Sequence, residues 1–347
     1  MHEMAGDSGM QLSLSRLKKS FELKQRNGMR VERKFVHAVS DVSLDIREGE
    51  SFGIVGESGS GKSTIARLIL GLEQPSEGSI EFEGRDVGAL TGAARKAYWK
   101  KVQMIFQDPF SSLNPRMRIG EILAEPMRNY VLGTGDLSEK VAEFLKLVGL
   151  PATASSRYPH ELSGGQRQRV AIAAALAVEP RIIVADEAVS ALDVSVQAQI
   201  INLLSDLKQQ FGLTYIFITH DLNLSVYFCD RIAVLYLGQI MEICSSDVLL
   251  KQPVHPYTQA LISAVPAVDP SKRRNRTRLT GEIPSPIDPP KGCPFHPRCA
   301  IAIARCSETR PVLTDIGDGH RAACHVVTQN LLPAAAAHPA ITSERAS

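Results

Sequence analysis

A glycine-rich stretch near residue 60 has the residue types and spacing of a phosphate-binding loop. It fits the pattern G-x-x-x-x-G-K-[ST] and reads Gly56-Glu57-Ser58-Gly59-Ser60-Gly61-Lys62-Ser63. Glycines let the backbone wrap tightly, so that successive N–H groups point at phosphate oxygens, and the helix that follows adds a favourable dipole. The pattern predicts that Lys62 reaches the β- and γ-phosphates of a nucleotide and that the Ser63 hydroxyl binds Mg²⁺.

Two acidic residues end an apolar run further along the chain. Residues 181–185, Arg-Ile-Ile-Val-Ala, lead directly to Asp186 and Glu187. The first acid can hold Mg²⁺, and the second can take a proton from an attacking water. Alone, such an ending most often means a solvated strand tip. Together with the loop at 56–63 it indicates a P-loop NTPase.

A second set of backbone donors for an anion follows Leu162. Ser163, Gly164 and Gly165 stand where a helix over 164–178 is expected to begin, so the positive end of that helix faces any anion bound there. As an isolated helix cap this sequence would be unremarkable. Two such anion sites in one chain are explained if each serves a different nucleotide in a dimer.

The elements that must position these residues alternate along the chain. Leu12, Leu14 and Leu17 suggest an early strand. Further strands are expected at 51–55, 102–106, 181–185 and 214–219, and helices at 63–70 and 194–210. This alternation predicts an α/β fold with a largely parallel sheet covered on both faces. Helices expected at 119–128, 138–148 and 164–178 have no strand between them, which predicts a helical insertion.

Two further segments complete this pattern of elements. The polar stretch 24–34 is expected to be a loop, and residues 232–237 and 239–243 a terminal hairpin that turns at Gly238.

The composition excludes several classes of protein. The 347 residues are 44% hydrophobic and 22% charged, which is the balance of a globular chain with a sizeable core. A net charge of +2 and an aromatic content of 5% argue against a strongly basic nucleic-acid binder and against a base-stacking surface. No apolar run reaches the roughly 18 residues of a membrane span, and no signal peptide is recognised. The chain is expected in the cytoplasm, with any membrane role supplied by a partner.

The composition changes after about residue 252. Of the 20 prolines, 11 lie between Pro253 and Pro311, and four of the six cysteines lie between Cys293 and Cys324. This change predicts a separate C-terminal appendage at 253–330 with little regular structure. The Ala-rich residues 331–347 are expected to form a flexible tail.

Residues 10–250 resemble an ATP-binding cassette (ABC) protein. The matching motifs are Walker A at 56–64, the Q-loop Gln107, the signature at 162–166, Walker B with its catalytic glutamate at Asp186 and Glu187, the D-loop Ser190-Ala191-Leu192-Asp193, and the switch residue His220. The resemblance implies a cassette over 1–252 with a RecA-like core, an N-terminal antiparallel β part and a helical subdomain at about 108–175. Ala188 departs from the family, where many members carry Pro.

The resemblance also implies a role for each motif residue. Glu187, His220 and Gln107 would be catalytic, and Mg²⁺ would be held by Ser63, Gln107 and Asp186. Phe21 would stack on the adenine, with Phe35 as its rival. The remaining nucleotide contacts would come from Gly56, Ser58, Gly59, Ser60, Gly61, Lys62, Ser63 and Thr64, and, on the partner's nucleotide, from Ser163, Gly164, Gly165, Gln166 and Asp193.

Longer stretches resemble the oligopeptide/dipeptide permease family, and within it the F-type subunit. They include residues 105–117, 158–166, 190–199, 255–261 and 292–299. The resemblance implies a peptide importer with a D-type ATPase as heterodimer partner, two transmembrane permease subunits and an extracytoplasmic binding protein. The chain would lie peripherally on the cytoplasmic face of the membrane and bind no nucleic acid.

Alternatives to peptide import remain at this point. Nickel, glutathione or murein peptides could be the solute instead. A non-transport ABC ATPase acting on DNA or ribosomes is the rival from another class, but its usual second cassette or long insertion is missing from this chain.

Cys293, Cys299, Cys306 and Cys324 are separated by 5, 6 and 17 residues. Structural zinc sites and common ferredoxins use tighter spacings, so the spacing alone leaves four free thiols as an alternative. The resemblance implies a [4Fe-4S] cluster of mainly structural role. His296 and His325 leave a zinc site open, and Cys229 and Cys244 are expected to be ordinary buried thiols. The basic residues 272–278 are expected to be a solvated linker or a contact for anionic lipid.

Overall fold

The computed structural model describes residues 9–27, 30–108, 112–130, 136–264, 279 and 281–331. The basic stretch 272–278 and residues 332–347 of the expected tail lie outside these ranges. No helix in the described part of the chain combines the length and the apolar character needed to cross a membrane.

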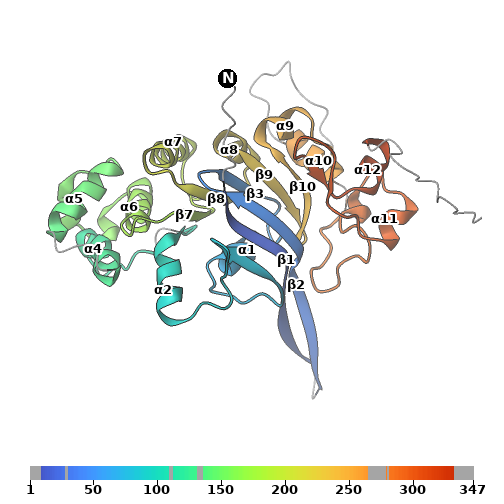
Figure 1. Ribbon diagram of the computed structural model, residues 1–347, viewed down its shortest axis with the longest axis horizontal. Helices are drawn as coiled ribbons and strands as arrows, with labels where there is room; N and C mark the ends of the chain where they lie inside the picture. Colours follow the sequence, from blue (N-terminus) through green and yellow to red (C-terminus); the bar gives the residue numbers. More distant parts are fainter. Residues whose placement is uncertain are drawn as a thin grey trace, which may run out of the picture.

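A large sheet lies at the centre of the molecule (Figure 1). It has eight strands in the order β11-β12-β10-β9-β3-β8-β7-β6. Strands β9, β3, β8, β7 and β6 are parallel, as expected for alternating strands and helices, and the last three of the sheet, β10 to β12, pair antiparallel. The bounds are β3 Ser51–Val55, β6 Val102–Ile105, β7 Ile182–Asp186, β8 Thr214–Thr219, β9 Arg231–Tyr236, β10 Gln239–Ser245, β11 Thr314–Asp315 and β12 Arg321–Ala322.

Both faces of this sheet are covered, which explains why a central strand such as β7 is apolar up to its last residue. In β7, Ile182 and Val184 pack into one hydrophobic cluster, whereas Ile183 and Ala185 pack into another. Successive side chains of a strand point to opposite faces, so a strand buried on both sides has no polar alternation. The two clusters hold the strand tips, and with them Asp186, in a fixed place.

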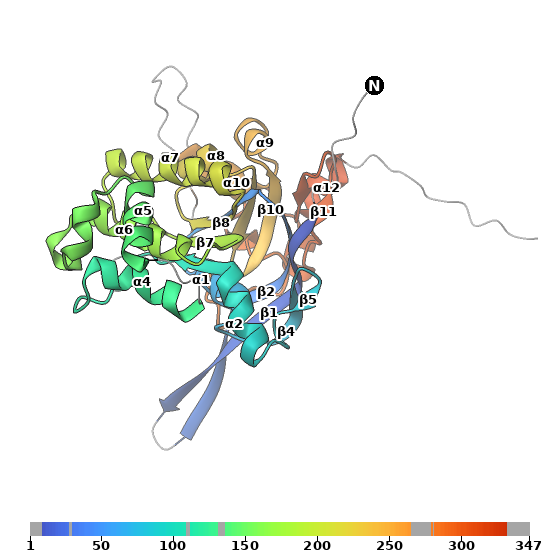
Figure 2. The same ribbon diagram turned by 60° about the vertical axis from the view of Figure 1, so that its left-hand side comes forward.

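A second, antiparallel sheet packs over helix α1 (Lys62–Ile69), as the resemblance implied. Its order is β2-β1-β4-β5, with bounds β1 Met10–Asn27, β2 Arg30–Arg47, β4 Glu77–Phe82 and β5 Arg85–Asp86. The loop expected at 24–34 is wrong, because β1 and β2 continue as paired strands through most of it (Figure 2). Arg33 Nε lies 3.3 Å from Glu22 Oε1 across the two strands, so opposite charges support a ladder that apolar patterning did not reveal.

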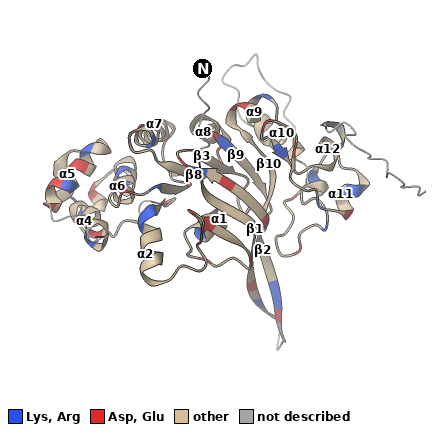
Figure 3. Cartoon of the chain, in the orientation of Figure 1, with Lys and Arg blue, Asp and Glu red and all other residues tan. Residues whose placement is uncertain are grey.

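The helical insertion expected from the sequence is present beside the central sheet (Figure 2). Helix α2, at the start of this region, was not predicted, because its sequence Gly-Ala-Ala-Arg-Lys-Ala-Tyr-Trp-Lys-Lys has no clear apolar stripe. Basic and acidic residues are interspersed over these helices and both sheets (Figure 3). The helices of the cassette are α2 Gly92–Lys101, α4 Ile119–Tyr130, α5 Leu137–Leu147, α6 Gly164–Leu176, α7 Val194–Phe211, α8 Leu222–Phe228, α9 Ser246–Lys251 and α10 Pro256–Ala264.

The C-terminal region is continuous with the cassette rather than a separate appendage. Strands β9 and β10 form the expected hairpin around Gly238, but it is not terminal, because β12 pairs antiparallel with β10. Cys293, Phe295 and Cys306 also belong to the same hydrophobic cluster as the cassette helices. Two-residue strands carry no periodicity, which is why the sequence did not reveal this connection. The remaining elements are the 3-10 turns η1 Ala152–Ser156, η2 Pro159–Glu161 and η4 His296–Arg298, and helices α11 Ala304–Glu308 and α12 His325–Leu331.

Candidate nucleotide-binding and hydrolysis site

The glycine-rich loop joins β3 to α1, the context that a phosphate-binding loop requires. A Cβ at Gly56 would lie 2.1 Å from the Leu235 carbonyl oxygen, and one at Gly61 would lie 2.2 Å from the Ala38 carbonyl oxygen. Gly61 also has φ +102°, which L side chains rarely adopt. The glycines are therefore needed for the loop to fit between β2 and β9, and the wrapped backbone suits an anion.

Lys62 lies inside this loop. Its Nζ donates to the carbonyl oxygens of Gly56 at 2.8 Å and Glu57 at 3.0 Å, and the residue is 5% exposed. Burial lowers the pKa of Lys62, while the negative charges of Glu187, Asp186 and Glu57 oppose that shift. The ammonium is thus enclosed among acids at the place where phosphate groups are expected.

Ser63 and Asp186 meet beside the loop. The Ser63 hydroxyl donates to Asp186 Oδ1 at 3.2 Å, although the two residues are 123 positions apart. Burial raises the pKa of Asp186, and the hydrogen bond from Ser63 lowers it. A hydroxyl and a carboxylate side by side offer the oxygen ligands that Mg²⁺ prefers, so this donor set fits the ion that the sequence predicts.

Glu187 lies between the other two residues predicted to be catalytic. Gln107 Nε2 donates to Glu187 Oε2 at 2.7 Å, and His220 Nδ1 lies 3.3 Å from Glu187 Oε1. These residues follow β6, β7 and β8, neighbouring parallel strands whose carboxyl ends share one edge of the sheet. Glu187 has φ +47°, a conformation rare outside glycine. The sheet therefore gathers residues that are 80 and 33 positions apart.

A cavity of about 790 Å³ opens over the loop and these catalytic candidates. Its lining residues are Val55, Gly56, Glu57, Ser58, Glu187, His220, Asp221, Leu222, Asn223, Leu261, Ala264 and Ile283. Ser60, in the same loop, has a buried hydroxyl with no hydrogen-bond partner within the described residues. The cavity brings the phosphate loop and Glu187 to one site.

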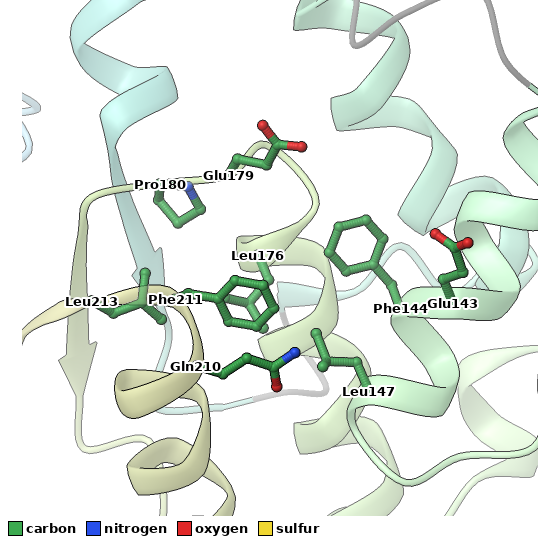
Figure 4. Close-up of a pocket in the computed structure, with 9 residues that line it drawn as sticks. All are labelled: Glu143, Phe144, Leu147, Leu176, Glu179, Pro180, Gln210, Phe211 and Leu213. Atoms are coloured by element: carbon green, nitrogen blue, oxygen red, sulfur yellow. The ribbon is translucent and has the colours of Figure 1, made fainter.

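A second cavity, of about 520 Å³, lies away from every predicted site residue (Figure 4). The phenyl rings of Phe144 and Phe211 and the side chains of Leu147 and Leu176 point into it, from α5, α6 and the end of α7. It therefore plays no part in the nucleotide site.

The signature residues occupy a different place. Ser163 caps α6: its hydroxyl accepts from the Gln166 N–H at 3.3 Å, and Gln166 Oε1 accepts from the Ser163 N–H at 3.1 Å. Helix α6 lies with α4 and α5 (Figure 1), and residues 163–166 are not among the described residues that line the 790 Å³ cavity. A Cβ at Gly165 would lie 2.7 Å from Val196 Cγ1 of α7, so Gly165 lets the two helices approach closely.

The D-loop connects Glu187 to the start of α7. The Ser190 hydroxyl donates to the Glu187 carbonyl oxygen at 3.0 Å, and Asp193 is the exposed N-cap residue of α7. Gly164 lies close enough to the D-loop that a Cβ there would be 3.5 Å from Leu192 Cδ2. The signature and the D-loop therefore form one continuous surface.

Phe21 lies in β1 opposite Val36, and Phe35 lies opposite Glu22. The Lys19 ammonium is 4.8 Å from the centre of the Phe21 ring, a cation–π contact that the sequence did not suggest. Phe35 is 48% exposed. Neither ring lines the 790 Å³ cavity, so the structure does not bring either aromatic to the phosphate loop.

The four C-terminal cysteines converge, although they span 32 residues of chain. The Cys293 N–H donates to the Cys306 carbonyl oxygen at 2.8 Å. The pKa of Cys293 is raised to about 12, chiefly by burial, and Cys306, Cys324 and Cys299 contribute in the same direction. The ring N–H groups of His296 and His325 donate to the carbonyl oxygens of Cys293 at 2.8 Å and Thr309 at 2.9 Å.

One buried cluster was missed altogether. Glu242, Cys244 and His320 bring three potential ligand atoms within 4.8 Å of one another, the only such group in the described residues. Glu242 is 0% exposed and accepts from the N–H groups of Val254 and His255, and His320 Nε2 lies 2.7 Å from its Oε1. The sequence signal that could have revealed this cluster was Glu242, an acidic residue inside the largely apolar strand 239–245. These bonds satisfy the carboxylate and join the C-terminal region to β10.

Two family models match parts of this chain. Residues 39–190 match the ABC transporter family model, and residues 241–306 match the model of the oligopeptide/dipeptide transporter C-terminal region. The ATP-binding cassette MJ0796, solved as a dimer in a post-hydrolysis state bound to ADP and Pi, has a TM-score of 0.59 and 31% identity, over 68% of this chain and 98% of that one.

Two relatives match over most of their length. The "Probable peptide ABC transporter ATP-binding protein y4tS" of Sinorhizobium fredii is 51% identical over 87% of this chain and 85% of its own. The oligopeptide transport ATP-binding protein AppF of Bacillus subtilis is 48% identical over 91% and 97%. The chain therefore belongs to the ABC transporter family of ATP-binding proteins that carry the oligopeptide/dipeptide transporter C-terminal region.

Proposed function

We propose that this protein is the ATP-hydrolysing subunit of an ABC importer and energises the uptake of di- or oligopeptides. The observation that carries the proposal is that Ser63 and Asp186 are hydrogen-bonded beside a phosphate-binding loop, while Glu187, the residue after Asp186, lines the cavity over that loop. The names of the relatives and the match over 241–306 support peptides as the solute.

In this proposal the residues of the site bind the phosphates, hold the metal ion or act on the attacking water, and Gln107 has two of these roles. Lys62 and the loop N–H groups bind the phosphates of ATP, and Ser63, Asp186 and Gln107 hold Mg²⁺, which supplies charge neutralisation when bound. Glu187 accepts a proton from the water that attacks the γ-phosphorus, while the bond from that phosphorus to the β–γ bridging oxygen breaks. His220 and Gln107 orient the Glu187 carboxylate through the contacts described above.

The signature residues serve a second nucleotide. Ser163 and Asp193 are exposed, and Gly164, Gly165 and Gln166 are half-buried; none of the five lines this chain's own cavity. We propose that they contact ATP held by a D-type partner in a heterodimer. Two transmembrane permease subunits and an extracytoplasmic binding protein complete the assembly, with this chain on the cytoplasmic face of the membrane. Phe21 is proposed to stack on the adenine.

Stimulation by solute tests the proposed substrate class. The purified, assembled transporter should hydrolyse ATP several-fold faster when its binding protein is loaded with a mixed peptide library than when it is empty. With Ni²⁺ or glutathione in place of peptide, the rate of ATP hydrolysis should equal the rate measured with the empty binding protein. Stimulation by Ni²⁺ or glutathione alone would contradict peptide import, and stimulation by murein peptides alone would narrow it to that class.

We also propose a [4Fe-4S] cluster held by Cys293, Cys299, Cys306 and Cys324. No three of their sulfur atoms lie within 4.8 Å of one another, since the described residues hold one such group and it lies elsewhere. Tetrahedral zinc with bonds of about 2.3 Å would draw its sulfurs to within roughly 4 Å. A four-iron cluster ties each thiolate to a different iron, so this wider gathering of thiols suits it better.

Anaerobic purification tests this cluster. The protein should be brown, with broad absorbance near roughly 400 nm and about four irons per chain. Cys299→Ser should lose the colour and loosen the region after residue 265, while the cassette stays folded. Cys229→Ala, which removes a buried thiol of the cassette, should keep the colour. Colourless protein that contains one zinc per chain would show that the cysteines form a zinc site instead of a cluster. Protein without metal would show that the four cysteines are free thiols.

A further inference from the structure

An ion pair joins the cysteine-bearing region to the phosphate-binding loop. Arg298 Nη1 donates to Glu57 Oε2 at 2.9 Å, and Nη2 donates to Glu57 Oε1 at 3.3 Å. The planar guanidinium thus contacts both carboxylate oxygens, a geometry that fixes orientation as well as charge. The residues are 241 positions apart, and Arg298 lies outside every ATP motif of the sequence.

Arg298 is held firmly by the region that carries the cysteines. It is the last residue of the turn η4 and directly precedes Cys299. Its side chain is 7% exposed, its Nη1 lies 3.3 Å from the Tyr236 hydroxyl, and its guanidinium carbon is 5.8 Å from the centre of the Tyr236 ring. The Phe295 ring packs edge-on against the same tyrosine. Any displacement of this turn would therefore move Arg298.

Three groups of Glu57 make contacts that hold the phosphate-binding loop in place. Its carboxylate pairs with Arg298, its carbonyl oxygen accepts from Lys62 Nζ at 3.0 Å, and its N–H donates to the Tyr257 hydroxyl at 3.1 Å. Glu57 also lines the 790 Å³ cavity. A carboxylate in this place repels phosphate groups unless a cation neutralises it.

We propose that Arg298 is a positioning residue for ATP binding, which holds and neutralises Glu57 so that the cysteine-bearing region keeps the phosphate loop and Lys62 ready for the nucleotide. The inference rests on the proposed ATP site. It goes beyond a merely structural role for the C-terminal region. Because the side chain of Arg298 bonds to Glu57 and Tyr236 and not to Glu187, its loss should change nucleotide binding and leave the rate at saturation nearly intact.

Affinity and turnover measured on the same variants test this role. In the assembled transporter, Arg298→Ala should raise the Kd and the KM for MgATP about tenfold, the effect of losing a hydrogen-bonded charge partner, and change kcat less than about twofold. Arg298→Lys, which keeps the charge but loses the fork, should fall between Arg298→Ala and the wild type. Arg305→Ala, an exposed arginine of the same region, is the matched control and should bind like the wild type.

Removing the unpaired charge provides the decisive comparison. Glu57→Gln combined with Arg298→Ala should restore the Kd to within about threefold of the wild type, because the amide no longer repels phosphate. A double variant as weak as Arg298→Ala, or an Arg298→Ala protein with wild-type affinity, would overturn the proposal. Thermal unfolding midpoints show whether a variant is misfolded. If Arg298→Ala is misfolded, the ATP affinity of Arg298→Lys decides whether the proposal stands. Wild-type protein that binds no ATP would instead refute the ATP site itself.

Discussion

Replacing Glu187 by Gln is expected to lower ATP turnover at least about a hundredfold, within the range for loss of a general base. The amide cannot accept the proton of the attacking water. Its size is nearly that of the carboxylate, so contacts with Gln107 and His220 remain sterically possible. Lys62, Ser63 and Asp186 are unchanged, so MgATP should bind with the affinity of the wild type, and the variant should accumulate as an ATP-bound closed pair.

Single-turnover hydrolysis and equilibrium ATP binding in the assembled transporter check this result. Glu83→Gln is the matched control, because Glu83 pairs with Lys101 and Arg181 at the surface and should not affect turnover. Near-normal hydrolysis by Glu187→Gln would remove Glu187 from the catalytic role and require another base.

Replacing Ser163 by Arg is expected to abolish hydrolysis at the partner's phosphate-binding loop. Ser163 is exposed at the start of α6, and residues 163–166 are not among those that line this chain's own 790 Å³ cavity. A bulky cation there would break the capping bonds with Gln166 and block the approach of the partner's nucleotide. Nucleotide binding at this chain's Lys62 should be largely intact.

Trapping of labelled nucleotide at each of the two sites separates the possibilities. Ser156→Arg introduces the same change at an exposed serine of the same helical region and should leave both sites active. Loss confined to the site of this chain's own Lys62 would refute the cross-subunit role of the signature.

The loops that carry the chemistry could be predicted from the sequence because the residues of each loop are contiguous in the chain. The loop at 56–63 carries its own glycines, and Asp186 with Glu187 directly ends an apolar strand. Parallel strands place such ends along one edge, so the meeting of Gln107, Glu187 and His220 also follows from the order of elements.

Other features depend on contacts that no local pattern encodes. The outer end of the β1–β2 hairpin, over 24–34, consists mostly of polar residues, so its sequence predicts a loop although the strands pair there. The bond between Arg298 and Glu57 joins two distant segments through side chains alone. Likewise the two-residue strand β12 is recognisable only because it pairs with β10, which makes the C-terminal region part of the cassette.

Uptake of labelled peptide by vesicles that contain the complete transporter, its binding protein and internal ATP tests the central claim most directly. We expect wild-type vesicles to accumulate peptide only with ATP and Mg²⁺ inside, and vesicles with Glu187→Gln to show no accumulation although ATP is bound. Equal accumulation in both preparations, or ATP hydrolysis without any peptide entering the wild-type vesicles, would contradict a peptide importer driven by this chain.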